Sequence, residues 1–195
     1  MTSDSISFDH SAAIDGLIER SFEAFKPPER LTVSEWAVRH RRLSPEGSAF
    51  TGRFRLETAP YQQEPMEAVN DTDVQSVVLM WASQTGKTEV INNVVGFFIC
   101  EEPSPMLVLQ PTLDMAETWS KDRLAPMVRD TAVLTDLVAD PKARDSGNTV
   151  LHKRFTGGHV TVAGANSPAS LASRPIRVVL CDEVDRYPQR AGAEG

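Results

Sequence analysis

Cysteine is scarce in this sequence, and long apolar runs are missing. The two cysteines, Cys100 and Cys181, stand in apolar surroundings without C-x-x-C spacing, which argues against a disulfide or a zinc site. The longest apolar run, near residues 94–100, is far too short to cross a bilayer, so no membrane association is expected. The first residues have no signal-peptide character, and we therefore expect a cytoplasmic protein.

Basic residues are outnumbered by acidic ones, and the net charge is −7. This balance argues against a protein that coats nucleic acid with its whole surface, although it leaves room for a local basic strip. The most basic cluster, Arg39-His40-Arg41-Arg42, follows a short helix that a capping box at Thr32 and Glu35 is expected to open. Two interpretations stay open: basic residues favour a helix C-terminus through its dipole, and they also bind DNA phosphates.

The N-terminal part of the chain is expected to form a helical arm. Apolar residues recur at helical spacing up to Pro27, which predicts an amphipathic helix. This helix either packs on a core or docks a partner protein. Its apolar residues are Ala13, Ile14, Leu17, Ile18, Phe22 and Phe25. A loop at residues 44–48 suggests a boundary there. We therefore divide the chain into an arm, residues 1–45, and a core domain, residues 46–195.

The central motif is the stretch of residues 75–89, where a short apolar run breaks into Gly86-Lys87-Thr88 and then into helix-forming sequence. A strand, a tight turn and a helix N-terminus in this order are typical of a phosphate-binding loop. Gly86 allows close approach of a phosphate, Lys87 can reach the β- and γ-phosphates, and the Thr88 hydroxyl can bind Mg²⁺. Trp81 stands where the usual pattern has its first glycine.

A second motif lies at residues 177–183, an apolar run that ends in Asp182 and Glu183. The run predicts a buried parallel strand whose carboxyl end carries the site. Asp182 would hold Mg²⁺ through its water shell, and Glu183 would orient and deprotonate an attacking water.

The remaining pattern predicts an α/β fold. We expect a buried helix over residues 86–100 and a strand over 106–110, which with the strand before the loop would make a right-handed, parallel βαβ unit. A further helix, capped by Thr112, should end at Pro126, and a hairpin should turn at Gly157-Gly158. Residues 163–175 suit a short helix near the nucleotide. Its Arg174 would contact a phosphate or pair with a surface acid.

Tyr61 and Gln62 precede the phosphate loop. An aromatic ring followed by an amide could stack on and hydrogen-bond to adenine. Tyr61 could equally lie at the edge of the core.

Taken together, these stretches resemble the N-terminal part of the large terminase subunit of tailed bacteriophages, of the GpA type, from about Ser34 to the last residue. The most distinctive stretch is residues 182–188. The resemblance rests on Ala59-Pro60-Tyr61-Gln62, Ser83-Gln84-Thr85-Gly86-Lys87-Thr88-Glu89, Gln110-Pro111-Thr112 with Ala116 and Arg123, Ser170-Leu171-Ala172-Ser173-Arg174-Pro175, and Asp182-Glu183-Val184-Asp185-Arg186-Tyr187-Pro188.

The resemblance implies a P-loop ATPase core of the additional-strand, RecA-like type, with three layers and a mainly parallel sheet. It implies hydrolysis of MgATP to drive double-stranded DNA into procapsids, with ATP and Mg²⁺ as cofactors. In this interpretation Lys87 and Glu183 are catalytic, and Thr88 and Asp182 hold Mg²⁺. The nucleotide would contact Tyr61, Gln62, Ser83, Gln84, Thr85, Gly86, Lys87 and Thr88.

The same resemblance implies partners and a location. These are double-stranded DNA, the small terminase subunit docked on the N-terminal helix, the portal of the procapsid, and further copies of the chain, all in the host cytoplasm. Terminases often depart from the standard loop at its first glycine, which accommodates Trp81. Residues 81–85 contain no basic residue, so an arginine acting on the γ-phosphate would come from elsewhere in the chain or from a neighbouring subunit.

One departure concerns length. Large terminase subunits continue into an RNase H-like nuclease, which is absent here, so we expect a fragment whose core sheet is incomplete at its C-terminal side. A non-catalytic nucleotide-binding or assembly module is therefore an alternative. A helicase-like ATPase would share both motifs, but residues 173–175 and 185–188 favour a terminase.

Overall fold

The computed structural model describes residues 14–18, 21–22, 29–48, 50–138, 147–167 and 175–189. The chain divides into two units, Met1–Arg30 and Leu31–Gly195. In the first unit, residues 14–18 and 21–22 are helical, as their spacing predicts. The apolar side chains described there are all exposed: Ile14, Leu17, Ile18 and Phe22.

The second unit begins at Leu31, so the boundary that we placed after residue 45 must be corrected. Helix α2 (Val33–His40) opens with the predicted capping box between Thr32 and Glu35. Its Trp36 is fully buried, and a Cβ on Gly96 of helix α4 (Lys87–Cys100) would lie only 2.1 Å from the Trp36 ring. Because the glycine lets the two helices approach so closely, α2 belongs to the core.

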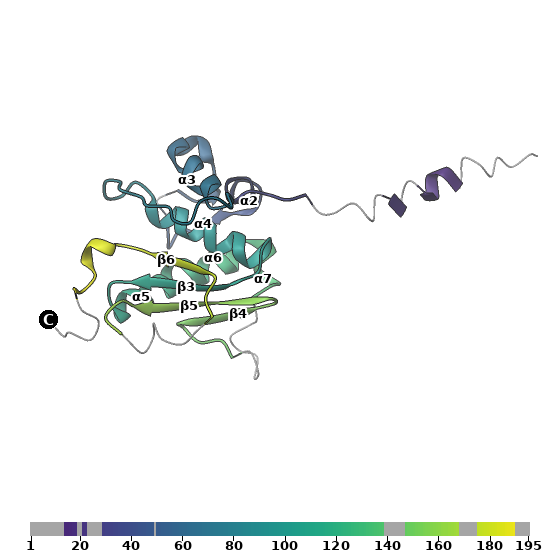
Figure 1. The fold of residues 1–195 in the computed structure, drawn as a ribbon. Coiled ribbons are helices and arrows are strands. Elements are labelled where there is room, and N and C mark those ends of the chain that lie inside the picture. Colours follow the sequence, from purple (N-terminus) through teal and green to yellow (C-terminus); the bar gives the residue numbers. More distant parts are fainter. Residues whose placement is uncertain are drawn as a thin grey trace, which may run out of the picture. The chain divides into compact units, whose positions relative to one another are not determined.

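The main sheet has the strand order β4-β5-β3-β6 (Figure 1). Strand β3 (Pro105–Gln110) lies between β5 (Gly158–Gly164) and β6 (Val178–Cys181) and is parallel to both. Strand β4 (His152–Phe155) forms the predicted antiparallel hairpin with β5, and the turn contains Gly157 at φ 87°. The strands predicted over residues 106–110 and before Asp182 are thus confirmed, although the second is not buried as expected, because its residues are partly or fully exposed.

A continuous helical region from Leu113 to Asp130 follows β3, so the helix end that we expected at Pro126 was wrong. Helix α5 (Leu113–Trp119) runs into a π-helical segment (Ser120–Leu124) and then into α6 (Ala125–Asp130). Helix α7 (Ala132–Thr135) follows after Thr131, whose backbone is extended. The N–H of Ala125 bonds to the carbonyl of Ser120, five residues back. This wider turn lets Pro126, which has no N–H to donate, enter α6 without ending the helix.

The remaining described elements are short. They comprise a two-stranded ribbon, β1 (Arg42–Leu43) and β2 (Gly52–Arg53), helix α3 (Gln63–Ala68) and 3-10 turns at Leu56–Thr58, Pro60–Gln62 and Val184–Arg186. No helix among the described residues is long and apolar enough to cross a membrane.

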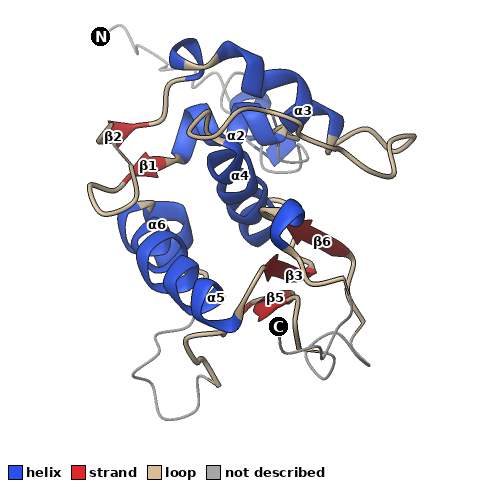
Figure 2. Ribbon diagram, turned by 90° about the vertical axis from the view of Figure 1, so that its left-hand side faces the viewer, coloured by secondary structure: helices blue, strands red, loops and turns tan. Residues whose placement is uncertain are grey.

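Helices α4, α5 and α6 lie on one side of the main sheet (Figure 2). The sheet face toward them belongs to the core cluster, with Met106, Val108, Val160 and Val162 buried. On the opposite face Val179 is 55% exposed, and within the described ranges no helix covers it. Leu107 and Thr161, in register with Val179 on that face, are nevertheless buried. The sheet is mainly parallel, as expected, and the third layer stays a prediction.

Residues 74–80 do not form the predicted strand. They are extended but outside any sheet, with Val74, Val77, Val78 and Met80 between 38% and 92% exposed. The prediction failed because an apolar run becomes a strand only beside a neighbour, and in the described part of the chain β6 is paired on its β3 side alone. The expected βαβ unit is therefore not formed.

Candidate functional site

The phosphate loop makes a tight turn before α4. Gln84 and Gly86 both have positive φ, at 61° and 86°. A Cβ on Gly86 would lie 2.3 Å from the Gln62 amide nitrogen, so this position needs glycine for both its conformation and its contact. The Thr85 hydroxyl donates to the Ala82 carbonyl at 2.7 Å and closes the turn. Alternating backbone conformations of this kind turn successive N–H groups toward one concave side, which suits an anion.

Lys87 fixes the entrance to the loop. Its Nζ donates to the carbonyl oxygens of Trp81 at 2.8 Å and Ala82 at 3.0 Å. The Trp81 ring meets the ring of Tyr61 edge to face, with centroids 5.2 Å apart. A tryptophan thus takes the glycine position of the usual pattern and adds an aromatic contact that holds the loop against residues 60–62.

Tyr61 and Gln62 are bonded to the loop. Tyr61 Oη donates to the Thr85 carbonyl at 3.0 Å, and Gln62 Nε2 donates to the carbonyls of Thr85 at 3.4 Å and Gly86 at 3.5 Å. Tyr61 is 51% exposed, so the core-edge alternative does not apply. Gln62 is buried, and its Oε1 has no hydrogen-bond partner. A buried acceptor without a donor is costly unless a ligand supplies one.

The opposite end of the loop meets the end of β6. Thr88 Oγ1 donates to Asp182 Oδ2 at 3.1 Å, and Gln110 Nε2 at the end of β3 donates to the same oxygen at 3.4 Å. Asp182 is buried, and its own N–H bonds to Leu109. The two motifs, 94 residues apart, are thus brought into contact.

This donor set fits Mg²⁺ rather than a metal bound by protein alone. In the described part of the chain, no group of three or more His, Cys, Asp or Glu side chains could hold an ion. Mg²⁺ prefers oxygen ligands and keeps several waters, using one or two protein oxygens together with substrate phosphates. A hydroxyl and a carboxylate beside a phosphate loop meet that requirement.

Glu183 lies one residue beyond, in a left-handed conformation at φ 51° that is unusual for a non-glycine residue. Its Oε2 lies 3.0 Å from Nη1 of Arg186, yet accepts no well-aligned hydrogen bond. No hydrogen bond in the described residues joins Glu183 to residues 82–88. Oε2 is buried against Arg186, but the side chain as a whole is 38% exposed, so the carboxylate can still accept a bond from water.

Several residues around the site entered the sequence analysis only as part of the resemblance, and their roles were missed. Gln110 ends a strand parallel to β6, and a polar residue at that position is a signal that could have identified it. Arg186 gave no such signal, because its pairing depends on the turn after β6. Tyr187 is also new: its hydroxyl donates to the Leu109 carbonyl at 2.9 Å, and burial is the main cause that raises its pKa.

A second missed feature stabilises the start of α4. Glu89 follows Thr88 and pairs with Arg41 at 3.3 Å and with Arg123 at 3.9 Å. Arg41 is buried, which lowers its pKa, while the charge of Glu89 opposes that shift. A small cavity beside this pair is lined by Arg41, Glu89, Asn92 and Arg123 and does not include residues 82–88. This contact therefore supports the loop helix without forming part of the loop.

Comparison with known proteins identifies the family. Residues 48–195 match the model of the phage terminase large subunit gpA, ATPase domain. The chain belongs to this family. Over 169 residues it is 28% identical to the terminase large subunit of Enterobacteria phage P21 and 27% identical to that of Escherichia phage lambda. No solved structure matches.

In both terminase comparisons the aligned region covers 86% of this chain but 26% of the relative. The chain thus spans about a quarter of the length of these large subunits. The matched region contains Tyr61, the loop, Asp182 and Glu183, while residues 168–174, including Arg174, lie outside the described residues.

Proposed function

We propose that this terminase ATPase domain binds ATP on residues 83–88 and hydrolyses it in a P-loop, RecA-like site. The observation that carries the proposal is the 3.1 Å hydrogen bond between Thr88 and Asp182, which joins the loop to the end of β6. Family membership favours ATP hydrolysis over mere anion binding.

Each side chain then has a distinct task. Loop N–H groups and Lys87 bind the phosphates, and the unpartnered Oε1 of Gln62 suits the 6-amino group of adenine. Thr88 and Asp182 would hold Mg²⁺, which would supply positive charge to offset the negative charge that develops on the phosphate. Glu183 would accept a proton from the attacking water, because its side chain is 38% exposed and Arg186 restrains only one end of the carboxylate.

We further place hydrolysis in the host cytoplasm, coupled to packaging double-stranded DNA into procapsids. The exposed apolar stripe of Ile14, Leu17, Ile18 and Phe22 supports docking of the small terminase subunit through a helix in a groove. A portal on the procapsid and further copies of the chain complete the proposed motor, and a neighbouring copy is one source for the arginine that acts on the γ-phosphate.

Steady-state hydrolysis of MgATP by the 195-residue chain, with and without duplex DNA, tests the proposal. Glu183→Gln should abolish turnover while nucleotide binding persists, whereas Lys87→Ala should abolish both. Asp185→Asn is the matched control, because Asp185 is exposed and only two residues beyond Glu183. Turnover that survives in the Lys87 variant would show that the phosphate loop is wrongly assigned.

A second candidate is nucleotide binding without turnover. The exposure of residues 74–80 favours it, since a loop without a strand before it is less firmly held. Binding that depends on Lys87, in a chain without turnover, would support this candidate.

A further inference from the structure

An arginine face on the β1–β2 ribbon is not used by the nucleotide site. It consists of Arg42, Arg53 and Arg55. The antiparallel register places Arg42 directly opposite Arg53. Side chains opposite each other in such a pair are about 5 Å apart at Cβ, and like charges there are destabilising.

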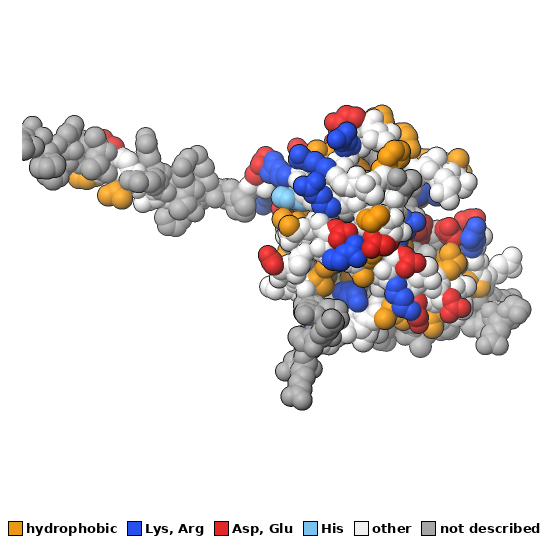
Figure 3. Space-filling view, turned by 180° about the vertical axis from the view of Figure 1, so that it is seen from behind, with side chains coloured by type: hydrophobic (Ala, Val, Ile, Leu, Met, Phe, Trp, Pro, Cys, Tyr) orange, Lys and Arg blue, Asp and Glu red, His pale blue; other side chains and the backbone are white. Residues whose placement is uncertain are grey.

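Alternation along the chain adds the third arginine. Phe54 is buried, so Arg53 and Arg55 on either side of it point the other way, and both are exposed. Figure 3 shows Lys and Arg side chains gathered beside a histidine on this side of the molecule. Three exposed cations are thus presented together.

Nothing described in the chain neutralises them. No ion pair involves Arg42, Arg53 or Arg55, and the only side-chain hydrogen bond among them runs from Arg53 Nε to the Val38 carbonyl at 3.1 Å. Glu57 is exposed two residues beyond Arg55 and pairs with none of them.

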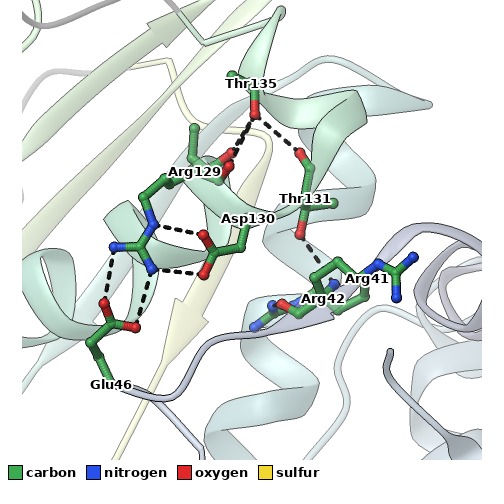
Figure 4. A network of polar contacts seen from close by, with 8 residues as sticks. Arg41, Arg42, Glu46, Arg129, Asp130, Thr131 and Thr135 are labelled. Atoms are coloured by element: carbon green, nitrogen blue, oxygen red, sulfur yellow. Dashed lines mark hydrogen bonds and ion pairs between the residues drawn. The ribbon is translucent and has the colours of Figure 1, made fainter. Parts of the chain in front are cut away.

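Two acids beside the ribbon, Glu46 and Asp130, are already committed (Figure 4). The Arg129 guanidinium donates two hydrogen bonds to Glu46, at 2.9 and 3.1 Å, and two to Asp130, at 2.6 and 2.7 Å. Thr131 accepts from the Arg42 N–H at 3.3 Å. These bonds hold the ribbon against α6 and α7 while leaving the Arg42 guanidinium without a carboxylate.

Arg41, by contrast, is buried and paired with Glu89, so it does not belong to the face. The members of the basic cluster Arg39-His40-Arg41-Arg42 therefore have different roles. Arg41 supports α4, whereas Arg42 is exposed and lies opposite Arg53 of β2. The helix dipole accounts for basic residues in the last turn of α2, but it gives no reason for Arg53 or Arg55.

We propose that the arginine face binds the phosphate backbone of double-stranded nucleic acid. With a net charge of −7, the surface as a whole repels a polyanion, so a local group of unpaired arginines fixes where one can approach. Arginine presents a planar fork of donors that matches phosphate oxygens, and backbone contacts need no base sequence. An acidic protein segment is the competing occupant. That the nucleic acid is double-stranded rests on the proposed function, as does the choice of duplex DNA as the probe.

The test is fluorescence anisotropy of a labelled duplex of arbitrary sequence, titrated with the full chain at several salt concentrations and without nucleotide. Arg42→Gln/Arg55→Gln should weaken binding on the order of tenfold and lower the salt slope by about 1.8, since each phosphate contact contributes about 0.9. Neither of these two side chains donates a hydrogen bond within the described residues. Arg154→Gln/Arg177→Gln removes the same charge from exposed positions on β4 and before β6 and should change neither quantity.

The proposal would be overturned if the Arg42/Arg55 variant kept its affinity for the duplex and its salt slope. It would also be overturned if the variant lost binding to poly-glutamate, a stand-in for an acidic protein segment, but still bound the duplex as before. If the variant fails to fold, modification of arginine by phenylglyoxal in the natural chain gives an independent readout. Duplex DNA should protect Arg42, Arg53 and Arg55 but not Arg154, and equal modification would contradict the proposal. Lys87→Ala should bind DNA normally. Failure of the ATPase proposal can therefore be distinguished from failure of the arginine-face proposal.

Discussion

Two segments lead into the candidate site and are held there in different ways. Strand β6 reaches Asp182 through hydrogen bonds to β3, in a register fixed along four residue pairs. Residues 74–80 reach the loop without sheet partners, and the loop is held by the side chains of Tyr61, Gln62 and Lys87. The proposed metal end of the site is thus positioned by the sheet, whereas the proposed nucleotide end depends on a few side-chain contacts.

The largest expected effect comes from the end positioned by the sheet. Asp182→Asn keeps the side-chain volume but removes the charge that receives Thr88 and Gln110. Losing one such electrostatic group typically costs about 10²–10³ in kcat, and we expect turnover of MgATP to fall by at least that factor. Asp185→Asn, with its exposed carboxyl, should retain turnover. Equal activity in both variants would mean that β6 does not supply the metal ligand.

The next largest effect is a difference in stability between the two segments. It can be measured by making the same Val→Ala substitution once in the sheet and once in residues 74–80. Val108→Ala in β3 removes fully buried methyl groups and should lower the free energy of unfolding by about 2 kcal/mol. Val78→Ala, at a side chain 77% exposed, should change it by less than about 0.5 kcal/mol. Urea unfolding of both variants checks this comparison. Equal losses would show that residues 74–80 pack against the protein in solution.

A smaller effect is expected at the nucleotide end. Gln62 Nε2 faces the carbonyls of Thr85 and Gly86, so Oε1 is the atom left to accept from adenine. Gln62→Leu keeps the volume and should weaken ATP binding about fivefold, since one hydrogen bond is worth about 1 kcal/mol. Binding of ITP, which lacks the 6-amino group, should change less.

The matched control is Gln63→Leu, because Gln63 donates to Glu67 at the surface and does not contact the loop. The assignment of Gln62 to adenine would be wrong if ATP and ITP lost affinity equally in the Gln62 variant.

The same contrast explains what the sequence could predict. Local patterns identified the capping box at Thr32, the helix after Lys87, the strand before Asp182 and the hairpin at Gly157, because each depends on neighbours in the chain. An apolar run at residues 74–80 carries the same local pattern as β6. Only the presence of a pairing strand separates the two, and the pattern does not report it.

Partner choice limits side-chain predictions in the same way. Arg41 and Arg42 are adjacent and chemically identical, yet one is buried against Glu89 and the other is exposed opposite Arg53. Thr88 and Asp182 were predicted as one site because each motif carries its own strand or helix context. Gln110 and Arg186 depend on how the strand ends meet, which is tertiary information.

The smallest expected effect concerns the ion pairs that hold the ribbon. Arg129 is the main cause that lowers the Asp130 pKa from 3.8 to about 2, and the Glu46 pKa is lowered by the same guanidinium. A carboxyl whose pKa is depressed by folding stabilises the protein above its ordinary pKa and ceases to do so as pH falls through the folded value. Because Asp130 is partly exposed, its contribution should stay below about 1 kcal/mol.

Asp130→Asn should therefore lower the free energy of unfolding by a constant amount above about pH 4, and the difference from the natural chain should vanish toward pH 2. Asp136→Asn, at an exposed acid without an ion pair in the described residues, should show no such difference. Urea unfolding between pH 7 and pH 2 provides the measurement. A difference that persists at pH 2 would mean that Asp130 stabilises the ribbon by packing rather than by its charge, and the arginine face would then rest on contacts insensitive to acid.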